Sequence, residues 1–195
     1  MFQLKQSRWI SHSSKMDHFE TDNILKSFSI IVDTREQVTP RAKKRYSDFG
    51  VEYTKGILDY GDYTYNLNLP SGKLHNVNKR IRGKCVIERK QNLDELAMCF
   101  TRSRDRFRRE FLRATEADAK VYLLIENASL DMLLKGQYRS RFKPQAFIAS
   151  LMAWAVRYNM TPIFCEMEHS GRIIKEVLYR DCKERLERGE LWVDG

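Results

Sequence analysis

The chain has 195 residues, which predicts one domain, or one domain with an extension, whose core needs neither a disulfide nor a metal to hold it. Lysine and arginine number 35 against 26 aspartates and glutamates, so the net charge of +9 favours a polyanionic partner, nucleic acid ahead of an anionic membrane. The hydrophobic share of 42% excludes a fully disordered chain, and no apolar run reaches the ~20 residues of a transmembrane helix.

The ends of the chain and its cysteines indicate where the protein works. The first 27 residues are polar and contain no apolar signal-peptide segment. The four cysteines form no CxxC pair and no zinc-ligand spacing with histidine, so we interpret them as reduced packing residues. We therefore expect an intracellular location, either the cytoplasm or the nucleoid or nucleus, and no membrane partner.

The first part of the chain predicts strands separated by one helix. Residues 1–27 lack periodicity and are interpreted as a flexible leader or a marginal helix. An apolar run ending in Asp33 predicts a buried strand, and Pro40 suits the first turn of a helix. The expected elements are a strand at 28–33, a helix from 40 towards 49, a strand at 51–54, an antiparallel strand at 62–69 and an exposed basic loop at 70–84.

The remaining chain alternates strands and helices. Asn92 is a suitable cap for a helix that begins at Leu93. The expected elements are strands at 85–89, 120–126 and 161–165, and helices from 93, at 104–116, 130–134, 144–158 and 173–186. This alternation predicts an α/β fold with a mixed central sheet flanked by helices, in a single domain over residues 28–190.

Three acidic residues stand at the ends of predicted buried strands. Asp33 ends one strand, Asp62 follows a Gly61 turn, and Glu88 ends a third. A carboxylate next to a buried run is costly unless it is paired or binds a cation. Lys90 lies two residues after Glu88 and so shares its face of the strand. Converging acids with a lysine suit Mg²⁺ or Mn²⁺ and phosphodiester hydrolysis.

Each of these residues taken alone has a simpler interpretation. A strand-end carboxylate is more often a turn cap, and a Glu-x-Lys pair on a strand is more often a solvated ion pair. The combination is more specific than its parts. It consists of Ile31-Val32-Asp33-Thr34-Arg35-Glu36, Gly61-Asp62-Tyr63, and Glu88-Arg89-Lys90 with Asp94 four residues after Lys90.

These elements, in this order, resemble the nuclease domain of the XPF family over residues 28–186. The resemblance implies a restriction-endonuclease-like fold and a divalent-metal-dependent endonuclease. The expected substrate is DNA with branches or junctions, in repair, recombination or replication. It implies Asp33, Asp62 and Glu88 as metal-binding acids, Mg²⁺ or Mn²⁺ as the ion, and Lys90 as the catalytic lysine.

Four further residues take roles from the same resemblance. Arg89 and Glu36 belong with the catalytic group, and Glu36 is expected to orient water or a ligand. Asp94 is expected to support the active site. Arg35 is expected either to hold the scissile phosphate or to brace the acids. The backbone carbonyl of Arg89 is a natural additional metal ligand.

Positive charge is concentrated in four blocks, at residues 35–45, 73–90, 102–113 and 135–143, and such blocks suit the phosphate backbone of DNA. Tyr138 and Phe142 lie within the last block and are interpreted either as base-stacking residues or as anchors of a loop. The residues expected to bind DNA are Arg35, Arg80, Arg82, Lys84, Arg102, Arg104, Arg106, Arg109, Arg139 and Arg141.

Two features of the expected family bear on partners. The helix-hairpin-helix module that usually accompanies the nuclease domain is absent from this sequence, so recognition of junctions is expected from a partner or not at all. The family also implies a homodimer, and the apolar helix at 144–158 is its candidate face. Phe147 and Trp154, at helical spacing on that helix, are interpreted either as core residues or as part of the dimer face. The alternative function is a catalytically silent DNA-binding or scaffold subunit, which is disfavoured because the acids and Lys90 are present.

Overall fold

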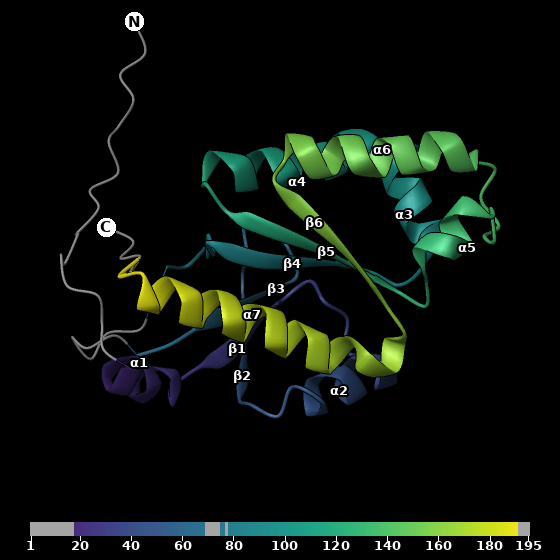
Figure 1. Cartoon of the computed structure of the whole chain (residues 1–195). Helices are drawn as coiled ribbons and strands as arrows, with labels where there is room; N and C mark the ends of the chain where they lie inside the picture. The colour runs from purple at the N-terminus through teal and green to yellow at the C-terminus, as the bar shows by residue number, and fades with distance from the viewer. Residues whose placement is uncertain (1–17, 69–74, 77, 191–195) are drawn as a thin grey trace, which may run out of the picture.

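The computed structural model describes residues 18–68, 75–76 and 78–190, and these fold around a six-stranded mixed sheet (Figure 1). The strand order is β2-β1-β3-β4-β5-β6, in which β3 is antiparallel to both β1 and β4 and the outer pairs are parallel. The strands are β1 Ser29–Asp33, β2 Tyr53–Gly56, β3 Tyr63–Asn66, β4 Cys85–Lys90, β5 Lys120–Glu126 and β6 Met160–Cys165.

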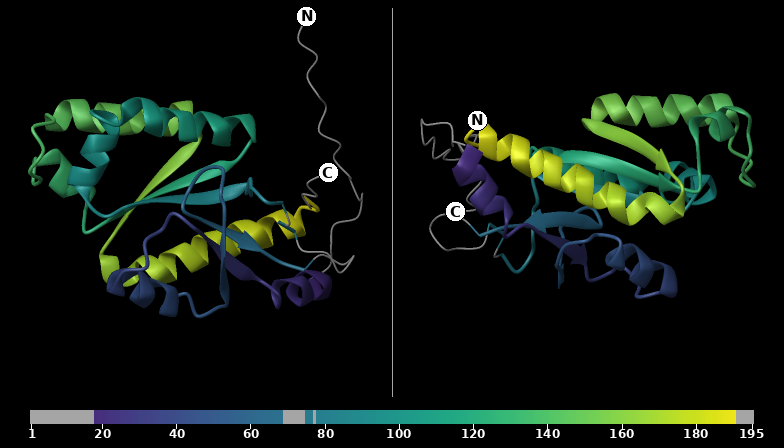
Figure 2. Two further views of the ribbon diagram at one scale, coloured as in Figure 1. Left: turned by 180° about the vertical axis from the view of Figure 1, so that it is seen from behind. Right: turned by 60° about the horizontal axis from the view of Figure 1, so that its bottom comes forward.

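Helices cover both faces of this sheet (Figure 2), as predicted for an α/β domain. The helices are α1 His18–Leu25, α2 Pro40–Ser47, α3 Leu93–Phe100, α4 Arg104–Glu116, α5 Leu130–Leu134, α6 Pro144–Arg157 and α7 Ser170–Glu187, with a single 3-10 turn, η1, at Met167–His169. One core packs α1, α2 and α7 on the sheet, and the other packs α3, α4, α5 and α6. In the described ranges no helix has the length and apolarity to span a bilayer.

Strand β5 shows why the apolar runs of this chain fold into central strands. Leu123 and Ile125 pack under α3, α4 and α6, whereas Leu124 packs under α7. Because successive side chains of a strand point to opposite faces, a strand buried on both faces reads as an unbroken apolar run. The predicted strand at 120–126 is therefore confirmed at both ends.

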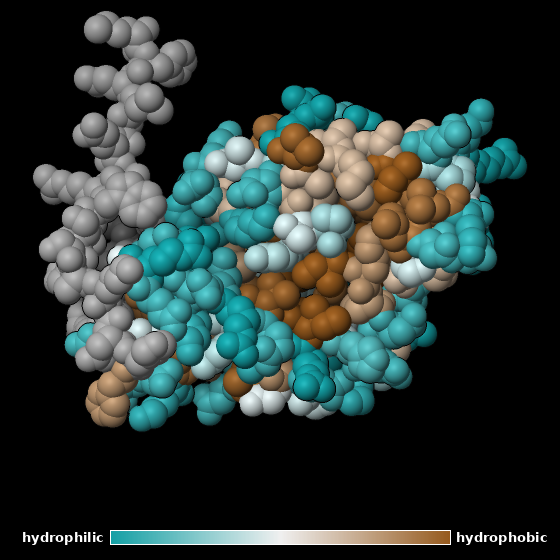
Figure 3. All heavy atoms as spheres, viewed as in Figure 1, coloured by the Kyte–Doolittle hydropathy of each residue, from teal (hydrophilic) through white to brown (hydrophobic). Residues whose placement is uncertain are grey.

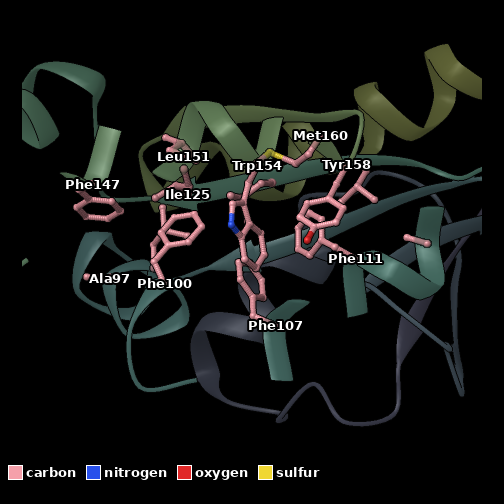
Figure 4. Close-up of a cluster of buried hydrophobic side chains, with 14 of the residues drawn as sticks. Ala97, Phe100, Phe107, Phe111, Ile125, Phe147, Leu151, Trp154, Tyr158 and Met160 are labelled. Atoms are coloured by element: carbon pink, nitrogen blue, oxygen red, sulfur yellow. The ribbon is translucent and has the colours of Figure 1, made fainter. Parts of the chain in front are cut away.

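The core beneath α6 is built from stacked aromatic rings (Figure 4). The Trp154 ring stacks on Phe107, with centroids 5.0 Å apart and planes at 19°, and meets Phe100 edge-on at 5.1 Å. Phe147 and Leu151 complete the buried face of α6. This face is core rather than a dimer surface, which decides between the two interpretations of Phe147 and Trp154.

Helix ends follow the predicted capping residues. The Thr39 side chain accepts a hydrogen bond from the Ala42 amide, just before Pro40 at the first turn of α2. The Asn92 side chain accepts one from the Glu95 amide at the start of α3. Strand β2 begins two residues later than predicted, at Tyr53, where its parallel pairing with β1 starts.

Two segments differ from the sequence-based expectation. Residues 18–25 form α1, whose Ile24 and Leu25 are buried in the core beside α7, so the helix interpretation holds there, and residues 1–17 lie outside the described ranges. In the basic loop, residues 69–74 and 77 also lie outside the described ranges. The rest of the loop is not wholly exposed, because Ile81 is buried and pairs with Leu58 as an isolated parallel bridge.

Replacing Trp154 with alanine tests the importance of the aromatic core. We expect Trp154→Ala to lower the free energy of unfolding by about 3–5 kcal/mol, because it removes stacked ring contacts and leaves a cavity. Val156→Ala on the same helix is the control, because Val156 is 87% exposed and should change stability by less than about 0.5 kcal/mol. Urea unfolding measures both, and equal effects would contradict the assignment of the core.

Candidate active site

Three adjacent strands bring the predicted acids together. The Asp33 amide donates to the Asp62 carbonyl at 2.8 Å, and the Asp62 amide donates to the Ile87 carbonyl at 2.8 Å. Asp62 therefore lies between the end of β1, which carries Asp33, and the part of β4 that carries Glu88. The convergence predicted from strand ends is what the structure shows.

The turn at Gly61 packs closely on β4 and fixes the position of Asp62. Gly61 has φ +73°, and a Cβ atom there would lie 2.9 Å from Cβ of Val86, so the turn requires glycine. Asp62 Oδ2 accepts a 2.7 Å hydrogen bond from the Arg89 amide. Burial, reinforced by the charge of Glu88, raises the pKa of Asp62 well above its ordinary value.

Glu88 and Lys90 share one face of β4 and form a buried ion pair. Lys90 Nζ lies 2.6 Å from Glu88 Oε1 and 5.1 Å from the centre of the Phe107 ring. Burial acts to lower the pKa of Lys90, but the charges of Glu88 and Asp62 outweigh it and raise that pKa. Lys90 therefore stays protonated at neutral pH and provides a fixed positive charge and hydrogen-bond donor.

Asp33 accepts hydrogen bonds from two neighbouring segments. Its Oδ1 accepts from the amide and Nε of Arg35, each at 2.7 Å, and its Oδ2 accepts from the Leu58 amide at 2.8 Å and from Arg35 Nη2 at 3.2 Å. Both oxygens of this fully buried carboxylate are thus occupied. In this arrangement Asp33 holds Arg35 and the turn at Leu58, and its metal-binding role stays a prediction.

A buried network of ionic groups lies beside Asp62. Arg89 Nη1 donates to Glu126 at 3.1 Å, and its Nη2 donates to Glu36 at 3.4 Å. Arg45 donates from Nε to Glu126 at 3.0 Å. The Tyr63 hydroxyl donates to the other Glu36 oxygen at 2.8 Å. Because these contacts occupy both Glu36 oxygens, Arg89 and Glu36 brace the site from behind, and the expected water-orienting role of Glu36 has no support here.

Sequence reasoning missed Glu126 and Arg45, although one signal was available. Glu126 ends a buried strand, as Asp33 does, and a fully buried carboxylate requires a partner. Arg45, on α2, was counted only within a basic block, but it is buried and lies within 2.9 Å of Glu126. A charge count along the chain cannot separate such a buried arginine from an exposed one.

Glu110 is a further acidic residue of the site that sequence reasoning missed. It lies on α4 and lines a small cavity with Gly61 and Glu88, and one of its oxygens is 4.0 Å from Arg35. Burial and the charge of Glu88 raise its pKa. The available signal was its place on the buried stripe of α4, next to Phe111.

The donor chemistry of the site fits a hard divalent cation. Asp62 and Glu88 offer carboxylate oxygens, the ligand type that Mg²⁺ and Mn²⁺ prefer, and their mutual repulsion is the kind that a cation relieves. No group of three or more acidic, histidine or cysteine side chains is already arranged for a metal among residues 18–68, 75–76 and 78–190.

Nine of the ten residues predicted to bind DNA are exposed. Arg35 is one of them, and it stays exposed while holding Asp33. Lys84 is the exception, because it is buried and its ammonium donates to the Ala117 carbonyl at 2.5 Å, so it cannot contact DNA. The exposed residues are Arg35, Arg80, Arg82, Arg102, Arg104, Arg106, Arg109, Arg139 and Arg141.

Asp94 supports a basic loop rather than the acids. Its Oδ1 accepts from the amides of Arg139 and Ser140, both at 2.8 Å, and its Oδ2 accepts from Arg139 Nε at 3.2 Å. Tyr138 and Phe142 anchor the same loop, since both rings pack on the buried Phe147. The loop-anchor interpretation of these aromatics is therefore confirmed, and Asp94 stiffens a segment that presents arginines.

Glu126 provides a test of the buried network. We expect Glu126→Gln to lower the free energy of unfolding by about 3 kcal/mol, because Arg45 and Arg89 would lose the carboxylate that compensates their charges. Glu116→Gln, an exposed change on α4, should stay within about 0.5 kcal/mol. Urea unfolding compares them, and a loss below about 1 kcal/mol for Glu126→Gln would show that the two arginines do not depend on it.

Comparison with known proteins agrees with this geometry. Residues 32–177 match the family model of the ERCC4 domain. Two solved structures are similar: XPF from Aeropyrum pernix, at 19% identity and a TM-score of 0.54, covering 78% of this chain and 61% of that chain, and XPF from Aeropyrum pernix in complex with DNA, at 20% and 0.54, covering 80% and 65%.

This chain thus spans less than two thirds of the XPF chains that it matches. No curated protein matches it. Because the family model covers most of the chain, the chain belongs to the ERCC4 domain family, and its fold is similar to that of XPF.

Proposed function

We propose that this ERCC4-domain chain is a divalent-metal-dependent endonuclease that hydrolyses phosphodiester bonds of branched or junction-containing DNA in repair, recombination or replication. The observation that carries the proposal is the meeting of Asp62 with the buried pair of Glu88 and Lys90 across β3 and β4. Two neighbouring buried carboxylates and a protonated lysine are costly for folding alone. They are suited to a cation and a phosphate.

Asp62 and Glu88 are the residues that would hold Mg²⁺ or Mn²⁺, with the Arg89 carbonyl as a further oxygen ligand. When bound, such an ion supplies positive charge that polarises a phosphate and lowers the pKa of water. Lys90 is fixed by Glu88 and donates a hydrogen bond towards negative charge that develops on the phosphate. Against the effect of burial, the charges of Glu88 and Asp62 raise the pKa of Lys90, which favours the protonated, donating form.

The remaining site residues position these groups. Asp33 holds Arg35 by two hydrogen bonds to its guanidinium, which leaves that arginine exposed and aimed by a rigid turn. Arg35 is the candidate for holding the scissile phosphate, and Glu36 and Arg89 stabilise the strand ends behind Asp62. The exposed arginines of α4 and of the loop held by Asp94 are proposed contacts to the DNA backbone.

Cleavage assays test the proposed enzyme directly. Wild-type protein should cut flap, splayed or junction DNA in Mg²⁺ or Mn²⁺, and Asp62→Asn, Glu88→Gln and Lys90→Met should each slow cutting by about 100-fold or more. Glu116→Gln serves as the control with unchanged cutting. Mn²⁺ affinity measured by electron paramagnetic resonance should fall for Glu88→Gln. Tight DNA binding with no cutting in either metal would favour the silent scaffold subunit instead.

A second copy of this chain is the proposed partner of the α6 and β6 surface. Figure 3 shows hydrophobic residues gathered between α6 and α7, where β6 crosses the molecule. Val156 and Met152 are exposed on the outer side of α6, and Ile163 is only partly covered on β6, the edge of the sheet. Exposed apolar residues next to a sheet edge favour a protein interface.

Sedimentation equilibrium at micromolar concentration tests this dimer. Wild-type protein should sediment as a dimer, and Met152→Glu with Val156→Glu should sediment as a monomer, because two charges would be buried in the contact. Val38→Glu is the control, since Val38 is also an exposed apolar residue, at 62%, but precedes α2 and lies outside this surface. A wild-type protein that is wholly monomeric would contradict the dimer.

A further inference from the structure

Three arginines from two separate segments converge on one carboxylate near the active site. Arg80 Nη1 lies 3.3 Å from Asp59 Oδ1, Arg82 Nε lies 3.4 Å from Asp59 Oδ2, and Arg113 Nε lies 3.6 Å from Asp59 Oδ1. The arginine side chains are 70%, 48% and 35% exposed respectively, so they remain open to a ligand. The three therefore form a half-open group of guanidiniums around Asp59.

The backbone explains why Arg80 and Arg82 point the same way. Ile81 lies between them, is buried against Leu58, and exchanges backbone hydrogen bonds with the segment before Tyr60: its amide donates to the Ile57 carbonyl at 2.7 Å, and its carbonyl accepts from the Asp59 amide at 2.9 Å. Neighbouring side chains of an extended segment point to opposite sides. Since Ile81 points inward, its two neighbours point outward together.

Arg113 joins this group from α4. Its Nε donates to the Asp59 carbonyl at 3.0 Å, in addition to its contact with the carboxylate. This backbone bond ties the helix to the turn, so the position of Arg113 does not depend on a charge alone. The three guanidiniums are thereby held by two independent elements, the loop paired with Leu58 and helix α4.

The charges in this group do not balance. Among residues 18–68, 75–76 and 78–190, Asp59 is the single carboxylate within 4.0 Å of these three guanidiniums. Bringing like charges together is unfavourable, and one carboxylate leaves about two positive charges uncompensated. Guanidinium groups present planar forks of donors that match phosphate oxygens. The group is therefore suited to a phosphate-bearing anion.

Its location connects it to the catalytic acids. Asp59 and Asp62 belong to one short turn, in which Gly61 packs directly on Val86 and the buried Tyr60 hydroxyl donates to the Gly83 carbonyl at 3.1 Å. The turn is thus fixed to β4 on one side and to the end of the basic loop on the other. A DNA strand placed at Asp62 would bring its neighbouring phosphates to the same surface.

We propose that Arg80, Arg82 and Arg113 form a binding site for a non-scissile backbone phosphate of the DNA substrate, and that Asp59 holds the three guanidiniums in place. This inference rests on the proposed function and adds a second anchoring point beside the reacting phosphate. The loop that supplies Arg80 and Arg82 thereby becomes part of the DNA-binding surface of this chain.

DNA binding without cleavage tests the site. The full chain is titrated with a fluorescein-labelled flap duplex in EDTA at several KCl concentrations, and fluorescence anisotropy gives the affinity. Arg80→Ala with Arg82→Ala should weaken binding about tenfold and reduce the slope of log affinity against log salt by about 1 to 2. Addition of Arg113→Ala should weaken binding further, because all three guanidiniums contact the phosphate.

Arg180→Ala on α7 with Arg188→Ala at its C-terminal cap is the matched control. These two side chains are 68% and 60% exposed, each is paired to glutamate at 3.5–3.7 Å, and the change in net charge is the same. Their loss should leave the salt slope unchanged, and thermal unfolding should show both double variants folded. If the loop variant misfolds, the single Arg80→Ala change at the most exposed position replaces it.

The outcomes separate this site from the proposed enzyme. Equal salt slopes for the loop variant and the α7 control would overturn the phosphate site while cleavage by wild-type protein still supported the enzyme. A wild-type protein that binds DNA without cutting would contradict the enzyme, and the binding comparison would still decide the phosphate site.

Discussion

The burial of Asp62 beside Glu88 is the constraint on which the rest of the site depends. Two carboxylates of like charge in a buried place repel each other and lose hydration, as the raised pKa of Asp62 shows. The Arg89 amide and the ammonium of Lys90 offset part of this cost. The cost that remains is the kind that a bound cation would relieve, so it supports the proposed metal site.

Next to the acids lies a network of buried carboxylates and arginines whose charges neutralise one another. Glu126 has no exposed surface, yet it receives donors from Arg45 on α2 and Arg89 on β4, and Arg89 also reaches Glu36. Breaking such a pair leaves an uncompensated buried charge, so each member holds the others in one arrangement. Through Glu126 and Arg45, the strand ends next to Asp62 are connected to helix α2.

Much of the fold could be predicted because local patterns and the global arrangement agree. The strand at 120–126 and the helix at 104–116 have the predicted bounds, since the first is an apolar run and the second a helical pattern, each with a defined end. The convergence of Asp62 and Glu88 could also be predicted, because both lie where buried strands begin or end. Predicting that convergence requires only the direction of the strands and the knowledge that they are neighbours.

The roles of individual acids could not be predicted in the same way. Asp33 has the same sequence context as a metal ligand, but the turn after β1 brings the Arg35 guanidinium and the Leu58 amide onto its oxygens. Leu58 is 25 residues away, so no local pattern contains that contact. Glu110 was hidden among the arginines of α4, and its orientation follows from the packing of Phe111 beside it.

Net charge is a poor guide to the proposed DNA-binding surface. A better guide is whether each arginine is already paired with a carboxylate. Arg45 and Arg89 count towards the +9 charge of the chain, yet both are occupied by buried carboxylates and present little charge outside. Arg80 and Arg82 share a single carboxylate with a third arginine and stay exposed. A phosphate gains from guanidiniums whose charge is not already neutralised, because the displaced partner is water or a loosely held counterion. The place where arginines exceed their carboxylates is therefore the surface that we propose for a polyanion beside the acids.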